Sequence, residues 1–406
     1  MTDPKHISIN DYHYELPESN IALFPSQERG NSNLLLAIGD NLAHTRFLNL
    51  NQHLPPDSSL IFNNTKVIRA RIIFFKPTGA SIELFLLEPH LPAEYQQNFE
   101  SIGSCEWTCL VGKAKKWKNE PLRMMLTIDE ESFELRAERL ETIDGKYRIR
   151  FEWNSSKSFA EVLDFAGKIP LPPYIHREVN SDDANRYQTV YSRLEGSVAA
   201  PTAGLHFTQA ILDELKANQH PLLELTLHVG IGTFKPVSSE QMADHNMHTE
   251  HFVVTANFLQ NLRSSKRNIA VGTTSLRTLE SIYWLSLQMQ QDPNCRYVPQ
   301  WIAYEQKAKL SPLEALDFLI DYLDKHQLKQ LEASTSILIV PGYQFQFIHG
   351  LITNFHLPKS TLILLVAALV GEHWRKIYDY ALKNNFRFLS YGDSSLLLPH
   401  NLNPTP

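Results

Sequence analysis

The densest group of side chains that could do chemistry is a histidine cluster, His245-Asn-Met-His248-Thr-Glu250-His251. Three imidazoles bind zinc only if they converge on one point. On a helix this spacing drifts around the face, and on a strand His248 points away from the other two. We therefore expect a polar loop that lines a site rather than a metal centre, with an exposed surface loop as the alternative.

A second unusual segment runs from Gly196 to Thr208 and consists almost entirely of small residues before His206. Small side chains let the backbone approach a ligand closely, and glycine permits a positive φ. Thr208 is of the right type to cap a following helix. The segment predicts either a loop that contacts a ligand or a tightly packed connector, and residue types alone do not separate the two.

Two short motifs match nucleotide-binding loops only in part. Gly230-Ile-Gly232 follows an apolar run, but Lys235 stands where a dinucleotide fingerprint has its third glycine. Lys359-Ser360-Thr361 has the ending of a P-loop without the glycines that precede it. We interpret this second motif as a helix start capped by Ser360 or Thr361, whose free N–H groups suit an anionic group.

Two basic clusters have the composition of phosphate-binding surfaces. Cations that alternate with an aromatic ring suit contacts to phosphates and bases, although a solvated turn explains them equally well. The first cluster surrounds Trp117 at a predicted turn, and the second follows Asn63-Asn64-Thr65. The candidate residues are Lys113, Lys115 and Lys116 in the first cluster and Lys66, Arg69 and Arg71 in the second.

The elements that must position these side chains follow two patterns. Between residues 60 and 155, short runs alternate in period two with few helices between them, most clearly Tyr147–Trp153. This spacing predicts a small antiparallel barrel. From about residue 200, apolar strands end at small or polar turns, which indicates an α/β domain with a largely parallel sheet. Ligands on such sheets bind beyond the carboxyl ends of the strands.

Five strands are expected in the α/β pattern, together with one additional segment. Residues 285–335 look like an addition, because Ser311 and Glu314 form a capping box before a single apolar helical face. We expect a packed helix there, without chemistry of its own. The expected strands are Leu222–Val229 before Gly230, Asn268–Val271 before Gly272, Ser336–Val340 before Pro341, Leu351–Thr353 before Asn354, and Phe386–Ser390 before Tyr391-Gly392-Asp393.

The composition is that of a folded protein with two or three domains. The chain has 406 residues, of which 43% are hydrophobic and 20% charged, and its net charge is −6. This excludes a disordered chain and argues against a surface that coats nucleic acid, although a local basic patch is compatible with it. Three cysteines form no disulfide framework. Because there is no apolar leader and no long apolar run, we expect a cytoplasmic protein that does not enter a membrane.

Long stretches in a fixed order resemble one family, the S-adenosylmethionine:tRNA ribosyltransferase-isomerases of queuosine biosynthesis. One departure is clear, because the family usually reads Arg-Asp-x-Ser-Arg-Leu-Leu where this chain has Arg29-Gly-Asn-Ser-Asn33-Leu-Leu35. The stretches that carry the resemblance are Tyr14–Pro17, Phe62–Val67, Pro170–Ile175, Tyr187–Tyr191, Gly196–Thr208, Thr226–Phe234, His245–Glu250, Val271–Ser275, Pro341–Tyr343, Thr353–Thr361 and Ser390–Asp393.

The resemblance implies an α/β domain with an inserted β-barrel, in agreement with the two patterns. We place the α/β domain at residues 1–64 and 156–406, the barrel at 65–155, and the additional helical segment at 285–335. The resemblance also implies that the ribosyl group of S-adenosylmethionine is transferred and isomerised onto the 7-aminomethyl-7-deazaguanine base at the tRNA wobble position. S-adenosylmethionine is then a co-substrate, so no permanently bound cofactor or metal is expected, and a monomer is favoured.

This reaction needs a base and an acid. The sulfonium makes the hydrogens of the adjacent ribose carbon acidic, and adenine leaves poorly unless a ring nitrogen is protonated. Imidazole, with an ordinary pKa of about 6.5, suits both roles. The family-matched histidines are His206, His228, His245, His248 and His356. The expected S-adenosylmethionine contacts are Gly230, Gly232, Thr233, Gly272, Thr273, Thr274, Ser275 and Ser360, with Glu250 or Asp393 on the ribose hydroxyls.

If tRNA is the substrate, we expect its stem to lie along basic surface, with the modified base turned out into the crevice. Two other functions stay open. An S-adenosylmethionine-dependent RNA methyltransferase would leave adenine attached to its sugar, and the missing glycine-rich fingerprint counts against it. A non-catalytic RNA-binding protein would use the barrel as a platform, and the net negative charge counts against that one.

Overall fold

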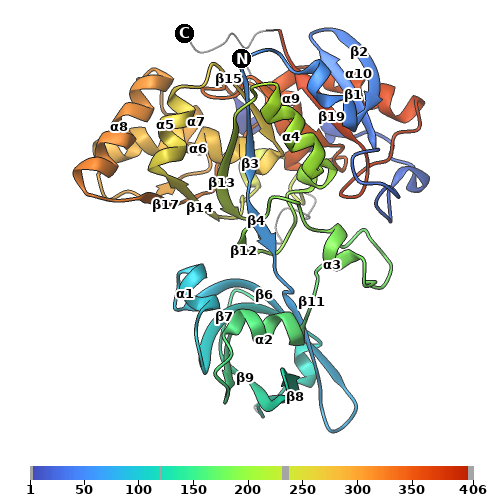
Figure 1. Cartoon of the computed structure of the whole chain (residues 1–406), viewed down its shortest axis with the longest axis vertical. Coiled ribbons are helices and arrows are strands. Elements are labelled where there is room, and N and C mark those ends of the chain that lie inside the picture. Colours follow the sequence, from blue (N-terminus) through green and yellow to red (C-terminus); the bar gives the residue numbers. More distant parts are fainter. Residues whose placement is uncertain (1–2, 119, 231–236, 401–406) are drawn as a thin grey trace.

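The computed structural model describes residues 3–118, 120–230 and 237–400, and it consists of two lobes (Figure 1). The larger lobe is built on a 10-stranded sheet and the smaller lobe on a 7-stranded sheet. A two-stranded ribbon of β4 (Thr65–Val67) and β12 (Leu194–Ser197) lies between them. The predicted combination of an α/β part and an antiparallel all-β part is confirmed.

The large sheet has a parallel centre, and both flanks contain parallel and antiparallel pairs. Strands β13, β3, β15 and β18 run parallel to one another, whereas β14, β17, β19 and β2 each pair antiparallel with a neighbour. The pairings of β16 with β17 and of β19 with β1 are parallel as well, so five of the nine pairings are parallel. The sheet is therefore mixed, in agreement with the predicted α/β domain that contains parallel strands. In sheet order the strands are β16 (Tyr297–Val298), β17 (Gln330–Thr335), β14 (Glu250–Thr255), β13 (Leu222–His228), β3 (Ser58–Asn63), β15 (Arg267–Val271), β18 (Gly350–Asn354), β19 (Ser394–Leu398), β1 (Asn33–Ile38) and β2 (Asn41–Arg46).

Two strands predicted in this lobe are wrong. Residues 336–340 form no strand and follow the end of β17, and residues 386–390 are irregular apart from one isolated bridge at Phe388. The turn Tyr391-Gly392-Asp393 precedes strand β19 instead of following a strand. Both runs are apolar and almost fully buried, and a buried apolar run has no period that distinguishes a strand from an irregular segment.

Helices pack around the large sheet (Figure 1). Helix α6 is buried along nearly its whole length, and Thr208 caps α4 as predicted. The Ser311 capping box before α8 is also confirmed. The segment 285–335 is not only helical, because it also supplies β16 and β17 at one edge of the sheet. The helices are α3 (Asp183–Arg186), α4 (Gln209–Ala217), α5 (Ala256–Arg263), α6 (Thr273–Gln291), α7 (Ile302–Glu305), α8 (Pro312–Lys325), α9 (Thr361–Val370) and α10 (His373–Lys383).

The small lobe contains the short antiparallel strands that the period-two pattern predicts, including β10 over the run Tyr147–Trp153. Helices α1 (Tyr95–Phe99) and α2 (Phe159–Ala166) accompany its antiparallel sheet. Its own hydrophobic core runs from Ile68 to Leu163 and includes Val198, so it extends past the predicted limits 65–155, which stay a prediction. In sheet order the strands are β11 (Gly167–Lys168), β5 (Arg71–Phe75), β6 (Ser81–Leu91), β7 (Ser104–Gly112), β10 (Lys146–Trp153), β9 (Glu131–Ile143) and β8 (Leu122–Ile128).

Helix α6, with 19 residues, is the longest in the described ranges, and Figure 1 shows it packed within the larger lobe. Membrane-spanning helices need about 20 predominantly apolar residues. Across residues 3–118, 120–230 and 237–400, no helix combines that length with sufficient apolar character to cross a membrane.

Candidate active site

A cavity lies at the edge of the large sheet where its parallel strands end. Val229, Gly272 and Asn354 line it from the carboxyl ends of β13, β15 and β18. The small-residue segment contributes residues 199–203 to the wall, and Leu389 and Ser390 close another side. Open α/β sheets bind their ligands at this edge. The structure thus places part of the Gly196–Thr208 segment against the cavity, as the ligand-contacting interpretation requires.

Two helices begin at this cavity. Helix α6 starts after Gly272, whose φ of 88° favours glycine, and α9 starts after Ser360, whose hydroxyl accepts a hydrogen bond from the Ile363 N–H. The first N–H groups of a helix have no partner within it, so both helix starts offer donors here. The predicted residues that line the cavity at these starts are Gly272, Thr273, Thr274 and Ser360. Ser275 does not line it, because its hydroxyl donates to the Val271 carbonyl at 2.8 Å.

The described wall of the cavity carries no carboxylate and no lysine or arginine, and its titratable side chains are His356 and Tyr174. Burial lowers the pKa of His356 to about 3 and raises the pKa of Tyr174 to about 12. The imidazole Nε2 of His356 is 3.2 Å from the hydroxyl of Thr353, and its Nδ1 is 3.4 Å from the hydroxyl of Tyr378. Both titratable groups are therefore neutral at pH 7, and the cavity suits an uncharged group.

His206 lies behind the cavity and holds an asparagine that lines it. Its Nδ1 is 2.8 Å from the hydroxyl of Ser32, and its Nε2 is 3.2 Å from Nδ2 of Asn354. Because an amide NH2 group only donates, Nε2 is the acceptor and the ring is neutral. Burial lowers the pKa of His206 to about 4, in agreement with that assignment. Both ring nitrogens are thus used by the protein itself.

His228 lies outside the cavity wall and joins the two lobes. Its ring stacks on Tyr95 of α1, with centroids 3.9 Å apart and 1° between the planes. Burial lowers the pKa of His228 to about 4. A Cβ at Gly196, whose φ is 137°, would lie 2.3 Å from Nδ1 of His228. The glycine at the start of the small-residue segment is therefore required by this stack.

Glu250 forms a buried ion pair with Arg277 and also contacts His248. Its Oε1 is 3.1 Å from Nε2 of His248, and its Oε2 accepts a hydrogen bond from Nη1 of Arg277 on α6. Burial acts to raise the pKa of Glu250, but Arg277 and His248 outweigh it and lower this pKa to about 2. The ion pair ties β14 to α6, and none of the three residues lines the cavity.

Replacing Arg277 with Met is expected to lower the free energy of unfolding by about 3 kcal/mol, because it leaves Glu250 buried without its main cation. Denaturant unfolding of both proteins at pH 7 measures the change. The double variant Arg277→Met, Glu250→Gln removes the uncompensated charge as well and should recover part of the loss. A loss below about 1 kcal/mol in the single variant would show that the pair is not coupled as described.

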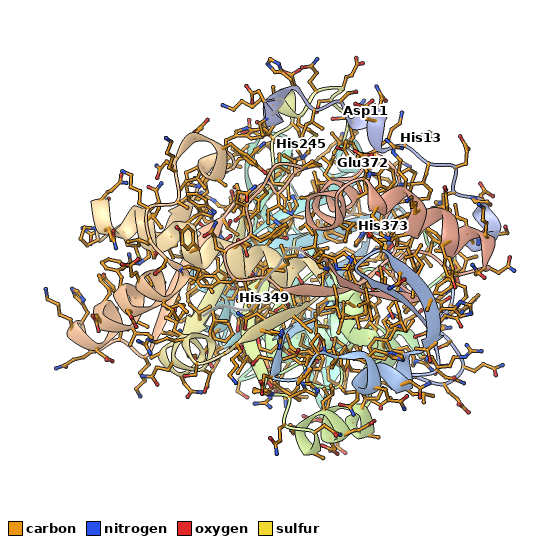
Figure 2. All side chains as sticks on the ribbon, turned by 90° about the horizontal axis from the view of Figure 1, so that it is seen from above. Asp11, His13, His245, His349, Glu372 and His373 are labelled. Carbon is orange, nitrogen blue, oxygen red and sulfur yellow. The ribbon has the colours of Figure 1, made fainter. Side chains whose placement is uncertain are left out.

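His245 lies beside the N-terminal segment. Figure 2 shows it on the same side of the lobe as Asp11 and His13, and the Met242 N–H donates to the Ile7 carbonyl at 3.1 Å. Its carbonyl accepts a hydrogen bond from the Gln300 side chain. Within the described ranges, no three His, Cys, Asp or Glu side chains gather closely enough to hold a metal ion. The surface-loop alternative fits His245 better than a catalytic position.

Asp393 is buried and fully occupied by protein partners. Its oxygens accept bonds from the Asn33 N–H at 3.0 Å, from Nδ2 of Asn33 at 3.1 Å and from the Arg387 N–H at 2.9 Å, and Nη2 of Arg387 lies 3.4 Å away. Asn33 begins β1 and Asp393 precedes β19, so the pair joins two neighbouring strands. The cation beside this carboxylate is Arg387.

Three predicted S-adenosylmethionine contacts remain, all in the segment after β13. Gly230 follows the end of β13 but does not line the cavity, and Gly232 and Thr233 lie outside the described residues. Tyr174, Thr353 and Asn354 were missed as site residues. Asn354 has a signal in the sequence, because it is a polar residue directly after an apolar run at a strand's carboxyl end.

The structure separates the two basic clusters by their partners. Lys66 pairs with Glu195 at 3.0 Å, Arg71 with Glu83 at 2.7 Å, and Arg69 lies 3.7 Å from Asp164. By contrast, no described carboxylate lies within 4.0 Å of the ammonium groups of Lys113, Lys115 and Lys116. Arg69 and Arg71 do line a wide hollow together with Lys168, His176 and Arg177. Unneutralised positive charge is therefore concentrated at the lysine turn between β7 and β8.

Comparison with known proteins shows the family to which this chain belongs. The model of a family described as queuosine biosynthesis protein matches residues 9–397. An S-adenosylmethionine:tRNA ribosyltransferase-isomerase of Treponema denticola is 37% identical over 399 residues, which cover 96% of this chain and 99% of that protein. The protein of the same name from Azoarcus sp. is 36% identical over 401 residues, or 96% and 97% of the two chains. A crystal structure of S-adenosylmethionine tRNA ribosyltransferase from Thermotoga maritima is 27% identical, covers 96% of this chain and 100% of that chain, and has a TM-score of 0.45. The chain belongs to the queuosine biosynthesis protein family.

Proposed function

We propose that this protein is an S-adenosylmethionine:tRNA ribosyltransferase-isomerase. The observation that carries the proposal is that relatives of this name match 96% of the chain at 36 to 37% identity. In this reaction the ribosyl group of S-adenosylmethionine is transferred to the 7-aminomethyl-7-deazaguanine base at the wobble position of tRNA and isomerised. The products are epoxyqueuosine-tRNA, adenine and methionine.

His356 is our candidate for the base. It is the one histidine of the five predicted that lines the cavity within the described residues. Burial keeps its ring neutral at pH 7, and the same lowered pKa makes it a weaker base than a free imidazole. The sulfonium acidifies the hydrogens of the ribose carbon bonded to it, so a neutral imidazole can remove one. The hydroxyls of Thr353 and Tyr378 lie beside the two ring nitrogens and fix the direction of the ring. His206 does not line the cavity and bonds to Asn354, so it is a positioning residue in this account.

The products of a single incubation test the proposal. Purified protein is incubated with S-adenosylmethionine and tRNA that carries the precursor base, and the small molecules are separated by chromatography. Free adenine and methionine in equal amounts support the proposed reaction. S-adenosylhomocysteine would instead identify a methyltransferase, and unchanged S-adenosylmethionine would leave only an RNA-binding role.

We also propose that the lysine turn contacts the tRNA backbone. The double variant Lys115→Ala, Lys116→Ala should weaken tRNA binding and reduce the slope of log K against log salt by roughly one for each phosphate that the protein no longer binds. Fluorescence anisotropy at several salt concentrations measures this slope. The control Lys325→Ala, Lys329→Ala removes two lysines at and after the end of α8, and its slope should match that of the unmodified protein. If the slope of log K against log salt is equal in all three proteins, the lysine turn does not contact tRNA and is exposed to solvent.

A further inference from the structure

Asn354 has one half of its amide engaged by the protein and the other half unused. The residue ends β18, lines the cavity and is 3% exposed. Its Nδ2 donates to the Leu389 carbonyl at 3.1 Å and to Nε2 of His206 at 3.2 Å. Its Oδ1 is buried and has no hydrogen-bond partner among the described residues.

The partners of Nδ2 fix the orientation of the amide. A carbonyl oxygen and an unprotonated imidazole nitrogen only accept hydrogen bonds, so they must face the NH2 group. A third acceptor, the Asp393 carbonyl, lies 3.4 Å from the same nitrogen. Rotating the amide by half a turn would place Oδ1 against all three acceptors. Oδ1 is therefore held as an acceptor that lacks a donor, on a residue of the cavity wall.

The surrounding wall indicates which ligand group supplies that donor. The described lining residues carry no charge at pH 7, so they suit an uncharged aromatic ring such as adenine. Adenine presents an exocyclic amine that donates and ring nitrogens that accept. The starts of α6 and α9 offer N–H donors to acceptors, and Thr274 adds a buried hydroxyl without a described partner. The cavity thus offers an acceptor, Oδ1 of Asn354, for the amine of adenine, and N–H and hydroxyl donors for its ring nitrogens.

We propose that Oδ1 of Asn354 accepts a hydrogen bond from the exocyclic amine of the adenine of S-adenosylmethionine and makes the protein select adenine over hypoxanthine. This inference rests on the proposed function, since it takes S-adenosylmethionine as the ligand. Hypoxanthine carries an oxygen in place of the amine, so it would set one acceptor against another. A site that is built to pair with a donor rejects the analogue that lacks it.

Binding of S-adenosylmethionine and of its hypoxanthine analogue, measured by isothermal titration calorimetry, tests the proposal. The unmodified protein should bind the adenine compound more tightly by roughly 10- to 100-fold. Asn354→Leu should lose that preference through weaker binding of S-adenosylmethionine alone. The matched control Asn268→Leu alters another buried asparagine with an unpartnered Oδ1, which lies on β15 away from the cavity wall, and it should keep the preference.

Equal binding of both compounds by the unmodified protein would overturn the proposal without any variant, so a folding defect in Asn354→Leu does not remove the test. A preference that survives Asn354→Leu would also overturn it, because another group would then read the amine. The product analysis described above is run on the same preparation. If the protein releases adenine but binds both compounds equally, only the inference about Asn354 is refuted. If the product is S-adenosylhomocysteine, the proposed function itself is contradicted.

Discussion

Replacing His356 with Gln is expected to reduce adenine release by roughly 10²- to 10⁴-fold, the usual contribution of a general base. Gln has a similar length and can still bond to the hydroxyls of Thr353 and Tyr378, but it cannot take up a proton. Binding of S-adenosylmethionine should change much less than the rate, because the substitution removes a proton acceptor and keeps the shape of the wall. Single-turnover measurements with precursor tRNA separate the two quantities.

The matched control for this variant is His220→Gln. His220 is also buried, and its Nδ1 is bonded to the Ser58 carbonyl at 2.9 Å, but it lies before β13 at the opposite end from the cavity. Its replacement should leave the rate near that of the unmodified protein. If His356→Gln releases adenine at a normal rate, His356 is not the base, and the assignment of proton transfer to this cavity fails.

Acidification from pH 7 to pH 5 is expected to lower the free energy of unfolding by about 3 kcal/mol, the net of a loss from three histidines and a smaller gain from Glu280. Burial raises the pKa of the Glu280 carboxyl to about 7, so in this window it takes up a proton in the folded state and not in the unfolded chain. Three histidines, His206, His228 and His356, are held neutral by burial, with pKa values of about 4, 4 and 3 in the folded protein. In the unfolded chain their ordinary value is about 6.5, so only the unfolded state takes up these protons between pH 7 and pH 5. Stability therefore rises with pH across this window and falls on acidification.

Urea unfolding at pH 7, 6 and 5 measures this dependence. His228→Phe, which can keep the stack on Tyr95, removes one of the three histidines and should reduce the net change by roughly half. Glu250 adds little in this window, because its lowered pKa costs stability only as the pH falls below about 4.5 towards 2. A free energy of unfolding that is constant from pH 7 to pH 5 would mean that the buried rings are not held neutral.

The sequence predicted the local elements well because their signals are local. The period-two alternation of Tyr147–Trp153 marks β10, and Thr208 and Ser311 mark the starts of α4 and α8 through side chains that bond within one turn. The cavity edge was also predictable in part, because the glycine after β15 and the cap before α9 stand next to their own elements.

Pairings between distant residues could not be predicted in the same way. The contact of His206 with Asn354 joins residues 148 positions apart, and that of Asn33 with Asp393 spans 360. A histidine that positions an asparagine and a histidine that removes a proton have the same sequence signal. Burial and partners, which the fold alone supplies, separate the two roles.

The direct test of the account follows the atoms of S-adenosylmethionine into the tRNA. The protein is incubated with precursor tRNA and S-adenosylmethionine that carries ¹⁴C in the ribose and ³H in the methyl group. The account predicts ¹⁴C in the tRNA and ³H in free methionine. Transfer of ³H to the tRNA, or tRNA without either label, would contradict the claim that this protein uses S-adenosylmethionine as a sugar donor.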